Sequence, residues 1–207
     1  MRKLFGFALA IAAIAAMNLT PIGADDKAKK DQPKEKLKTE IEVPFVPTHQ
    51  KVVESMLKLA AVKEGDTVYD LGCGDGRIVL TAVSQFKAKK GLGLDFDPER
   101  LKDCEANVKK AIDEKKLTAE QAKTMTFKQG DVLKMTAADF KDVDVVTLYL
   151  YPSVNLRLRP VLQEGLKEGA RIVSHDFDMG DWAPDKKEEV MADRTHTIYL
   201  WTIKKKK

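Results

Sequence analysis

Three glycines at alternate positions, Gly72, Gly74 and Gly76, stand in the segment VYDLGCGDGRIVL, between one short apolar run and the next. Glycine lowers the stability of a helix or strand unless the backbone needs its freedom. This spacing therefore indicates a tight turn or a group that approaches the backbone closely. The apolar runs predict a strand that ends at this loop and a helix that follows it. A strand, a glycine loop and a helix in succession predict an α/β fold.

The alternation of helix and strand patterns continues along the chain. Apolar residues at helical spacing in HQKVVESMLKLAAV predict one helix, and Asp97 followed by Pro98 is typical of the start of another. Strands are predicted in GDTVYDL, GLGLDF, MTFKQ, VDVVTLYL and ARIVSHDF, the last two apolar enough to be buried and parallel. TIYLWTI has no helix after it and is expected to enter the sheet antiparallel. We therefore predict a doubly wound α/β domain with its ligand site at the carboxyl ends of the strands.

The two ends of the sequence depart from this pattern. Residues 1–24 combine two basic residues, an apolar stretch and a small-residue end, which is the layout of a secretory signal peptide or an uncleaved anchor. Residues 25–40 are almost entirely charged or polar and predict a disordered linker. We expect one folded domain at 41–203 and a basic tail at 204–207. The protein is expected to be exported, as a periplasmic or secreted protein, or to associate with a membrane through its N-terminus.

Charge and cysteine content exclude several classes of protein. The formal net charge of +4 equals that of the four lysines at 204–207, so the rest of the chain is neutral and no nucleic-acid partner is predicted. Cys73 and Cys104 have neither the spacing of a zinc site nor the density of a disulfide scaffold. Both are expected to be free thiols. The oligomeric state is not indicated by any pattern in the sequence.

The glycine loop matches neither of two common phosphate-binding patterns. A dinucleotide fingerprint needs its third glycine one position later, where Arg77 stands, and the Gly-Lys-Ser/Thr of a phosphate loop is absent. Acidic residues are instead expected at the ends of three successive strands, at Asp70, Asp95 and Asp131. A carboxylate at the end of the second strand can accept from both hydroxyls of a ribose. An ordinary tight turn with unrelated loop acids is the alternative.

The loop resembles the first motif of the class I, seven-stranded methyltransferases that depend on S-adenosyl-L-methionine. The resemblance implies a Rossmann-like, mostly parallel seven-stranded sheet with helices on both faces and an antiparallel last strand. It also implies that an acid at the loop receives the cofactor's ammonium group and that Asp131 contacts the adenine amino group. The cofactor-binding residues expected on this basis are Asp70, Gly72, Cys73, Gly74, Asp75, Gly76, Asp95, Asp131 and Val132.

Further segments, VPFVPT, VVTLYLYPSVN and RIVSHDFDMGDWAPD, look like a branch of small methyltransferases. That branch includes the mitochondrial lysine methyltransferases acting on the ATP synthase c-subunit and the adenine nucleotide translocase. The resemblance implies N-methylation of a lysine in a protein substrate. Two alternatives stay open: methylation of nitrogen or oxygen in a small molecule, and a nucleotide-binding module without catalytic activity.

The loop after the fourth predicted strand is the expected place of catalysis. Many amino-methylating relatives carry Asn/Asp-Pro-Pro-Tyr there, whereas this chain has YLYPSVN, which makes Tyr149, Tyr151, Pro152 and Asn155 the catalytic candidates. Methyl transfer needs a neutral nucleophile in line with the sulfonium, and aromatic faces tolerate the moving positive charge. The two tyrosines are equally compatible with a place in the core or at the rim of the cleft.

A histidine and a group of acids follow in the next strand and its loop. His175 is a candidate general base, although transfer from a sulfonium needs no strong base, so a structural role is equally compatible. The spacing of Asp176, Asp178, Asp181 and Asp185 misses that of a calcium loop, and no metal site is predicted. An acidic rim that attracts a lysine side chain explains these residues as well.

Overall fold

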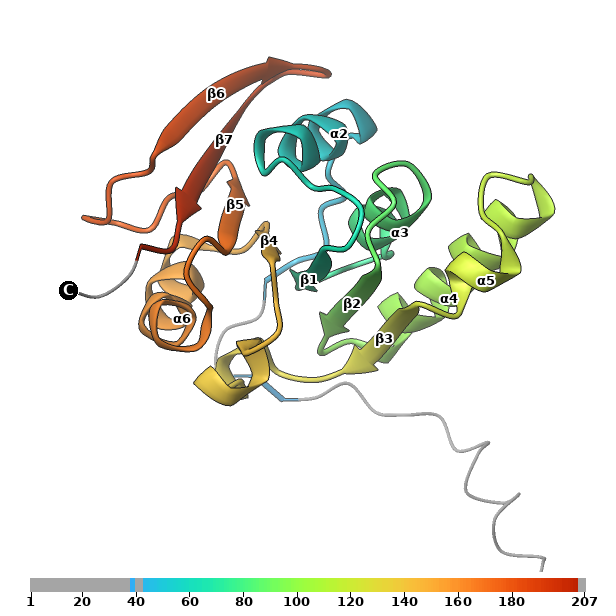
Figure 1. Cartoon of the computed structure of the whole chain (residues 1–207), viewed down its shortest axis with the longest axis horizontal. Coiled ribbons are helices and arrows are strands. Elements are labelled where there is room, and N and C mark those ends of the chain that lie inside the picture. Colours follow the sequence, from blue (N-terminus) through green and yellow to red (C-terminus); the bar gives the residue numbers. More distant parts are fainter. Residues whose placement is uncertain (1–37, 40–42, 205–207) are drawn as a thin grey trace, which may run out of the picture. The chain divides into compact units, whose positions relative to one another are not determined.

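The computed structural model describes residues 38–39 and 43–204, which belong to one compact unit (Figure 1). The predicted signal peptide or anchor at 1–24 lies outside the described residues, as do all but two residues of the linker at 25–40. Of the basic tail, only Lys204 is described. No helix in the described part of the chain is long and apolar enough to span a bilayer.

Seven strands form a single sheet with the order β3-β2-β1-β4-β5-β7-β6 (Figure 1). The strands are β1 (Thr67–Leu71), β2 (Lys90–Asp95), β3 (Met125–Gln129), β4 (Val145–Leu148), β5 (Arg171–His175), β6 (Lys186–Met191) and β7 (Thr195–Thr202). The five strands from β3 to β5 pair in parallel, while β7 runs antiparallel to both of its neighbours. The predicted mostly parallel sheet with an antiparallel last strand is confirmed.

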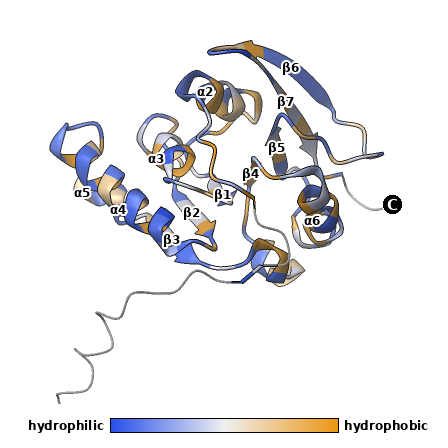
Figure 2. Ribbon diagram, turned by 180° about the vertical axis from the view of Figure 1, so that it is seen from behind, coloured by the Kyte–Doolittle hydropathy of each residue, from blue (hydrophilic) through white to orange (hydrophobic). Residues whose placement is uncertain are grey.

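Helices cover both faces of the sheet (Figures 1 and 2), as predicted. One face carries α2 (Gln50–Leu59), α3 (Arg77–Ser84), α4 (Pro98–Asp113) and the short α5 (Ala119–Ala122). The other carries α6 (Pro152–Gly165) and the 3₁₀ helices η1 (Val132–Lys134) and η2 (Ala137–Phe140). Each face has its own apolar core, one built mainly on α2 and α3 and the other on α6 and η2.

Local sequence signals explain where these helices begin and which side they bury. Asp97 caps α4 by accepting a hydrogen bond from Glu99 N at 2.9 Å, and Pro98 is the first helical residue, both as predicted. The apolar stripe of α2 is buried against the sheet. All four residues of β4 are buried, which fits a central strand covered on both faces. The edge strand β6 is hydrophilic along most of its length (Figure 2), which discourages pairing with another chain.

The strand order changes direction between β1 and β4, the two central strands. Ligands of doubly wound sheets bind at such a switch point, outside the carboxyl ends of the strands. The glycine loop follows β1 directly, and the loop beginning at Tyr149 follows β4. The topology therefore brings together the two segments that the sequence singles out.

Candidate active site

A cavity of about 470 Å³ lies at the carboxyl ends of β1, β2 and β4. Its size falls in the range of ligand pockets. Its walls come from the glycine loop, the ends of β2 and β3, the loop after β4, and the extended segment 43–48 that precedes α2. Most of the predicted site residues line it, namely Asp70, Gly72, Cys73, Gly74, Asp75, Asp95, Asp131, Val132, Tyr149 and Tyr151.

The glycine loop explains its glycines in two ways. Gly72, Gly74 and Gly76 all have positive φ angles, which residues with a Cβ rarely adopt. A Cβ on Gly74 would lie 2.7 Å from Phe45 Cδ2, and one on Gly72 would lie 2.6 Å from Leu150 Cδ2. Gly76 is the N-cap residue of α3 and does not line the cavity, and a Cβ there would lie 2.7 Å from Phe127 Cε1. Its glycine is required by packing behind the loop.

Asp70 contributes a carboxyl oxygen without a hydrogen-bond partner to the cavity lining. The residue is 2% exposed, and its Oδ1 accepts a hydrogen bond from Thr147 Oγ1 at 2.6 Å, while Oδ2 is buried without a partner. Burial raises the pKa of this carboxyl to about 7, and the nearby Asp95 adds to the shift. A buried carboxylate oxygen of this kind is stabilised by a cationic donor, such as an ammonium group, in the cavity.

Asp95 holds the glycine loop in place. Its Oδ2 accepts from Gly74 N at 2.9 Å and its Oδ1 from Asp97 N at 3.0 Å, so each oxygen keeps a lone pair for a further donor. Burial raises the pKa of this carboxyl. The residue links the end of β2 to the loop after β1. Its role with ribose hydroxyls stays a prediction that this position permits.

The remaining cofactor candidates occupy the rim and floor of the cavity. Asp131 caps η1 through Oδ1, which accepts from Leu133 N at 2.9 Å, and Val132 is the first residue of η1. Cys73 and Cys104 are free and buried, as predicted. The neighbouring Cys104 thiol and burial raise the pKa of Cys73 far above its usual value, so it stays a neutral thiol.

The segment before α2 contributes residues that the sequence reasoning did not assign to the site. Phe45 lines the cavity over the glycine loop, and the Arg100 guanidinium lies 4.7 Å from the centre of its ring. Arg77 pairs with Asp75 at 2.6 Å and donates through Nη1 to Thr48 O at 2.9 Å. These contacts tie the segment to the loop. The only signal was the VPFVPT motif, which has no periodicity that assigns a role to single residues.

An aromatic wall lines the cavity and consists of Tyr149 and Tyr151, from the loop after β4, and Phe177, from the loop after β5. The ring of Phe177 lies 6.2 Å from that of Tyr149 and 6.4 Å from that of Tyr151. Two predicted catalytic residues lie elsewhere: Pro152 starts α6, and Asn155 is fully buried. The Asn155 amide donates to the backbone carbonyls of the loop after β5 and so anchors that loop to α6. The geometry places Asn155 in support of the site, outside the cavity.

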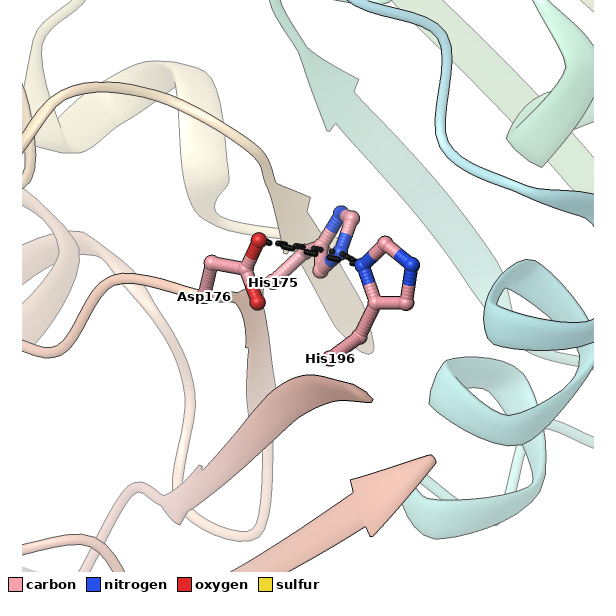
Figure 3. Close-up of side chains that lie close together, drawn as sticks. All are labelled: His175, Asp176 and His196. Atoms are coloured by element: carbon pink, nitrogen blue, oxygen red, sulfur yellow. Dashed lines mark hydrogen bonds and ion pairs between the residues drawn. The ribbon is translucent and has the colours of Figure 1, made fainter. Parts of the chain in front are cut away.

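His175 lies directly behind this wall, with its ring centre 3.8 Å from that of Tyr149. It is fully buried, and its Nδ1 lies 3.1 Å from Thr48 Oγ1. Its Nε2 lies 2.8 Å from Nδ1 of His196, which stands beside it in Figure 3. Burial lowers the pKa of His175 to about 4, so the imidazole is neutral at pH 7. His196 could not be found from sequence, because the pairing of β7 with β5 brings it here.

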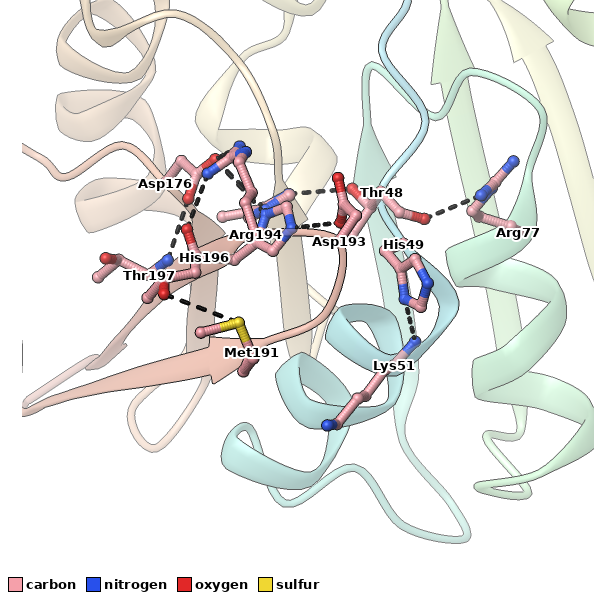
Figure 4. Close-up of polar contacts among 12 residues, drawn as sticks. Thr48, His49, Lys51, Arg77, Asp176, Met191, Asp193, Arg194, His196 and Thr197 are labelled. Carbon is pink, nitrogen blue, oxygen red and sulfur yellow. Dashed lines mark hydrogen bonds and ion pairs between the residues drawn. The ribbon is translucent and has the colours of Figure 1, made fainter.

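Most of the acids after β5, which the sequence suggested as an acidic rim, are paired with basic side chains. Asp176 accepts hydrogen bonds from Arg194 and from Thr197 N (Figure 4). Asp181 pairs with Arg159. Burial alone would raise the pKa of Asp176, but these donors hold it below its usual value. Of the four expected rim acids, Asp176 and Asp181 are thus paired with arginines and Asp185 with Lys204.

The residues of the cavity fit S-adenosyl-L-methionine. Asp70 Oδ2 can receive its ammonium, the bare backbone of Gly72 and Gly74 can lie against its amino-acid part, and Asp95 is placed for a hydroxyl pair. The bound cofactor would supply an electrophilic methyl group on sulfur. The protein supplies the positions, the charge and the exclusion of water.

Known methyltransferases are similar to this chain over most of its length. The model of the ANTKMT methyltransferase domain matches residues 70–186. The chain is 40% identical over 162 residues to the protein-lysine N-methyltransferase of Saccharolobus islandicus, covering 78% of this chain and 94% of that one. It is 30% identical over 168 residues to the adenine nucleotide translocase lysine N-methyltransferase of Mus musculus, covering 79% of this chain and 64% of that protein.

A solved structure is similar over the same region. The Salinibacter ruber protein, described as an RNA methyltransferase in complex with S-adenosyl-L-homocysteine, is 44% identical, with a TM-score of 0.67. The match covers 78% of this chain and 96% of that chain. Fold, cavity and relatives together define an S-adenosylmethionine-dependent methyltransferase. The chain belongs to the ANTKMT methyltransferase family.

Proposed function

We propose that this enzyme N-methylates a lysine side chain of another protein. The observation that carries the proposal is the aromatic wall of Tyr149, Tyr151 and Phe177, which lines the cavity after β4 and β5. The relatives from Saccharolobus islandicus and mouse, named for lysine methylation, support it. Tyr151 is 39% exposed, so the wall reaches the surface, where a side chain of a folded protein can approach.

The wall suits an amine that must shed its proton before it reacts. Only a neutral amine has the lone pair that attacks the methyl group. Burial among aromatic rings disfavours the ammonium form and lowers the pKa of the lysine. After transfer the nitrogen is cationic again, and the ring faces tolerate that charge. The neutral His175 behind Tyr149 adds no positive charge against it.

RNA is a second candidate acceptor, because the Salinibacter ruber relative is described as an RNA methyltransferase. The charge of this chain does not favour it. The positive net charge is equal to that of the four lysines at 204–207, and Asp131 stands at the cavity itself. Proteins that bind RNA backbones concentrate Lys and Arg on one face.

The compartment is part of the proposal. The signal-peptide or anchor layout of residues 1–24 supports action on envelope or membrane proteins, outside the cytoplasm or at the membrane. Mass spectrometry of the native protein tests this. A mature chain that begins near Asp25, or an intact N-terminus in a membrane fraction, is the expected result. An intact N-terminus in the cytosol contradicts it.

The acceptor is tested with the full chain, methyl-labelled S-adenosylmethionine, and three substrate pools: bacterial envelope protein, total RNA, and a small-molecule extract. Labelled methyl-lysine in hydrolysed protein is the expected product. Tyr149→Ala should abolish it while cofactor binding persists, because the wall loses its inner ring. Tyr199→Ala is the matched control, since this tyrosine is also half-buried but lies on β7, outside the cavity lining.

Each other result selects a different function. Label confined to RNA would support the RNA alternative, and label confined to small molecules would support the small-molecule one. Methyl-lysine formed equally by Tyr149→Ala and the control would remove the aromatic wall from the mechanism.

A further inference from the structure

A chain of four hydrogen-bonded side chains runs from the cavity wall to the protein surface (Figures 3 and 4). Thr48 Oγ1 lies 3.1 Å from His175 Nδ1, and His175 Nε2 lies 2.8 Å from His196 Nδ1. His196 Nε2 lies 2.8 Å from Asp193 Oδ1. Thr48 lines the cavity, the two histidines are buried, and Asp193 is 64% exposed. The chain therefore connects solvent to the active site through two imidazoles.

The acid at the outer end fixes the direction of every hydrogen bond. A carboxylate only accepts, so His196 must carry its proton on Nε2 and accept at Nδ1. His175 must then donate from Nε2, which leaves its Nδ1 as an acceptor. The hydroxyl of Thr48 is therefore the donor to His175. This order holds only while both rings are neutral, and burial lowers the pKa of His175 to about 4.

The fixed order leaves Thr48 with one defined capacity. With its proton committed to His175, its hydroxyl oxygen keeps lone pairs that can accept a hydrogen bond, and the residue lines the cavity. Arg77 Nη1 holds the backbone carbonyl of the same residue at 2.9 Å, so the position of Thr48 is set from two sides. Its hydrogen-bond partner His175 lies against the Tyr149 ring, so Thr48 is two contacts away from the aromatic wall.

Other titratable and charged groups lie around the hydrogen-bond chain of Thr48, His175, His196 and Asp193. Asp176 Oδ2 lies 3.5 Å from His175 Nε2 and 3.8 Å from His196 Nδ1, and Arg194 pairs with this carboxylate. The contact with His196 holds the pKa of Asp193 below its usual value, and His49, next to Thr48 in sequence, is another titratable group near Asp193. These groups come from the three elements around the pair: the segment before α2, the end of β5 and the β6–β7 turn.

The same side chains invite comparison with a metal site. One ligand atom each from His175, Asp176 and His196 lie within 4.8 Å of one another. All four ring nitrogens of the histidines already have hydrogen-bond partners, however, and Arg194 occupies the Asp176 oxygen. A hydrogen-bond chain accounts for these contacts without a cation.

We propose that Thr48 is a catalytic hydroxyl that accepts a hydrogen bond from the N–H of the substrate amine and so aims the nitrogen lone pair at the methyl group. His175, His196 and Asp193 are positioning residues that act through Thr48. The inference rests on the proposed amine acceptor. It adds a requirement for an N–H on the reacting nitrogen, and it makes an exposed acid on the β6–β7 turn a determinant of catalysis.

The decisive variant is Asp193→Asn in the full chain. An amide can donate as well as accept, so the order of donors is no longer imposed and Thr48 loses its fixed direction. We expect kcat for methyl-lysine formation to fall about tenfold, the equivalent of one hydrogen bond to substrate, with cofactor affinity unchanged. Asp113→Asn makes the same change of charge at an exposed position on α4 and should leave kcat unchanged.

A spectroscopic measurement tests the hydrogen-bond chain without any need for a methyl acceptor. The protein has three histidines, so their ¹⁵N resonances can be assigned by single substitutions. His175 and His196 should both show the Nε2–H tautomer in the wild type and mixed tautomers in Asp193→Asn. Thr48→Val should lower kcat about tenfold, and Thr48→Ser, which keeps a hydroxyl, should lower it less.

The inference would be overturned by wild-type tautomers other than Nε2–H on both histidines. It would also be overturned by a wild-type kcat in Asp193→Asn, or by equal rates in Thr48→Ser and Thr48→Val. Equimolar Zn²⁺ that shifts the imidazole resonances would also overturn it, by showing the nitrogens to be metal ligands. Absence of methyl-lysine even from the wild type is the separate failure of the proposed function. It would remove the amine role of Thr48, while the resonances would still report the hydrogen-bond order.

Discussion

The ring of Phe45 covers Gly74 so closely that a Cβ on Gly74 would lie 2.7 Å from Phe45 Cδ2. The glycine loop therefore has a cover from the segment before α2, and Arg100 stacks on the outer side of the same ring. The absence of a side chain on Gly74 serves this contact as well as the approach of a cofactor. Cofactor binding should consequently depend on the extended segment as much as on the loop.

Gly74→Ala should weaken cofactor binding at least tenfold, because the new methyl group displaces Phe45 from the cavity wall. Calorimetry with S-adenosylhomocysteine measures this. Gly65→Ala is the matched control, since Gly65 also has a positive φ, +93°, but no atom lies within 4 Å of its Cβ position. It should cost about 1 kcal/mol of folding free energy and leave affinity unchanged. Equal affinity losses in both variants would show that backbone strain, and not the Phe45 contact, is responsible.

Cofactor affinity should rise with pH between about 5 and 7, a range in which most of the cofactor's ammonium keeps its charge. The ionised form of Asp70 is the one that receives an ammonium, and burial raises its pKa to about 7. Below that pH the carboxyl is neutral, and affinity should fall towards tenfold per pH unit. Thr147→Val should move the midpoint to higher pH, because the Thr147 hydrogen bond lowers this pKa. A flat profile in the wild type, equal to that of Asp70→Asn, contradicts the assignment of Asp70.

Asp95→Ala should weaken cofactor binding by about 1.5–3 kcal/mol, the scale of hydrogen bonds to a charged group. The loss includes the loosening of the loop, since Gly74 N loses its acceptor. Asp139→Ala removes another carboxylate that accepts from a backbone N–H, that of Thr136, but it lies outside the cavity lining. Unchanged affinity in a folded Asp95→Ala protein would exclude the ribose role.

Folding stability should decrease as pH falls from about 6.5 to about 4. His175 has a pKa lowered to about 4 by burial, so the unfolded chain binds its proton at a higher pH than the folded one. The difference corresponds to up to about 3 kcal/mol at the acid end. Denaturant titrations at several pH values measure it, and His175→Gln should reduce the slope while His49→Gln, at an exposed position, keeps it. Identical slopes in all three proteins would show that His175 titrates normally.

Much of the architecture follows from local sequence signals. The apolar stripe of α2, the Asp97 cap of α4 and the mainly apolar, fully buried β4 each depend on residues within one element, so their patterns could be interpreted directly. Asp70 and Asp95 also follow from position, because the carboxyl ends of neighbouring parallel strands meet at one edge of the sheet. The sequence by itself thus determined the fold class, the strand-end acids and the region of the site.

Only the tertiary structure decided which side chains meet within that region. Phe45 lies over Gly74, 29 residues away in the sequence, and His196 lies beside His175, 21 residues away. Neither pair shares a helix or strand, so no periodicity in the sequence could predict these contacts. The same holds for Asn155, which the sequence assigned to catalysis and the packing of α6 turned towards the loop after β5. Short-range periodicity sets which face of an element is buried. Contacts between elements depend on how the whole sheet brings those faces together.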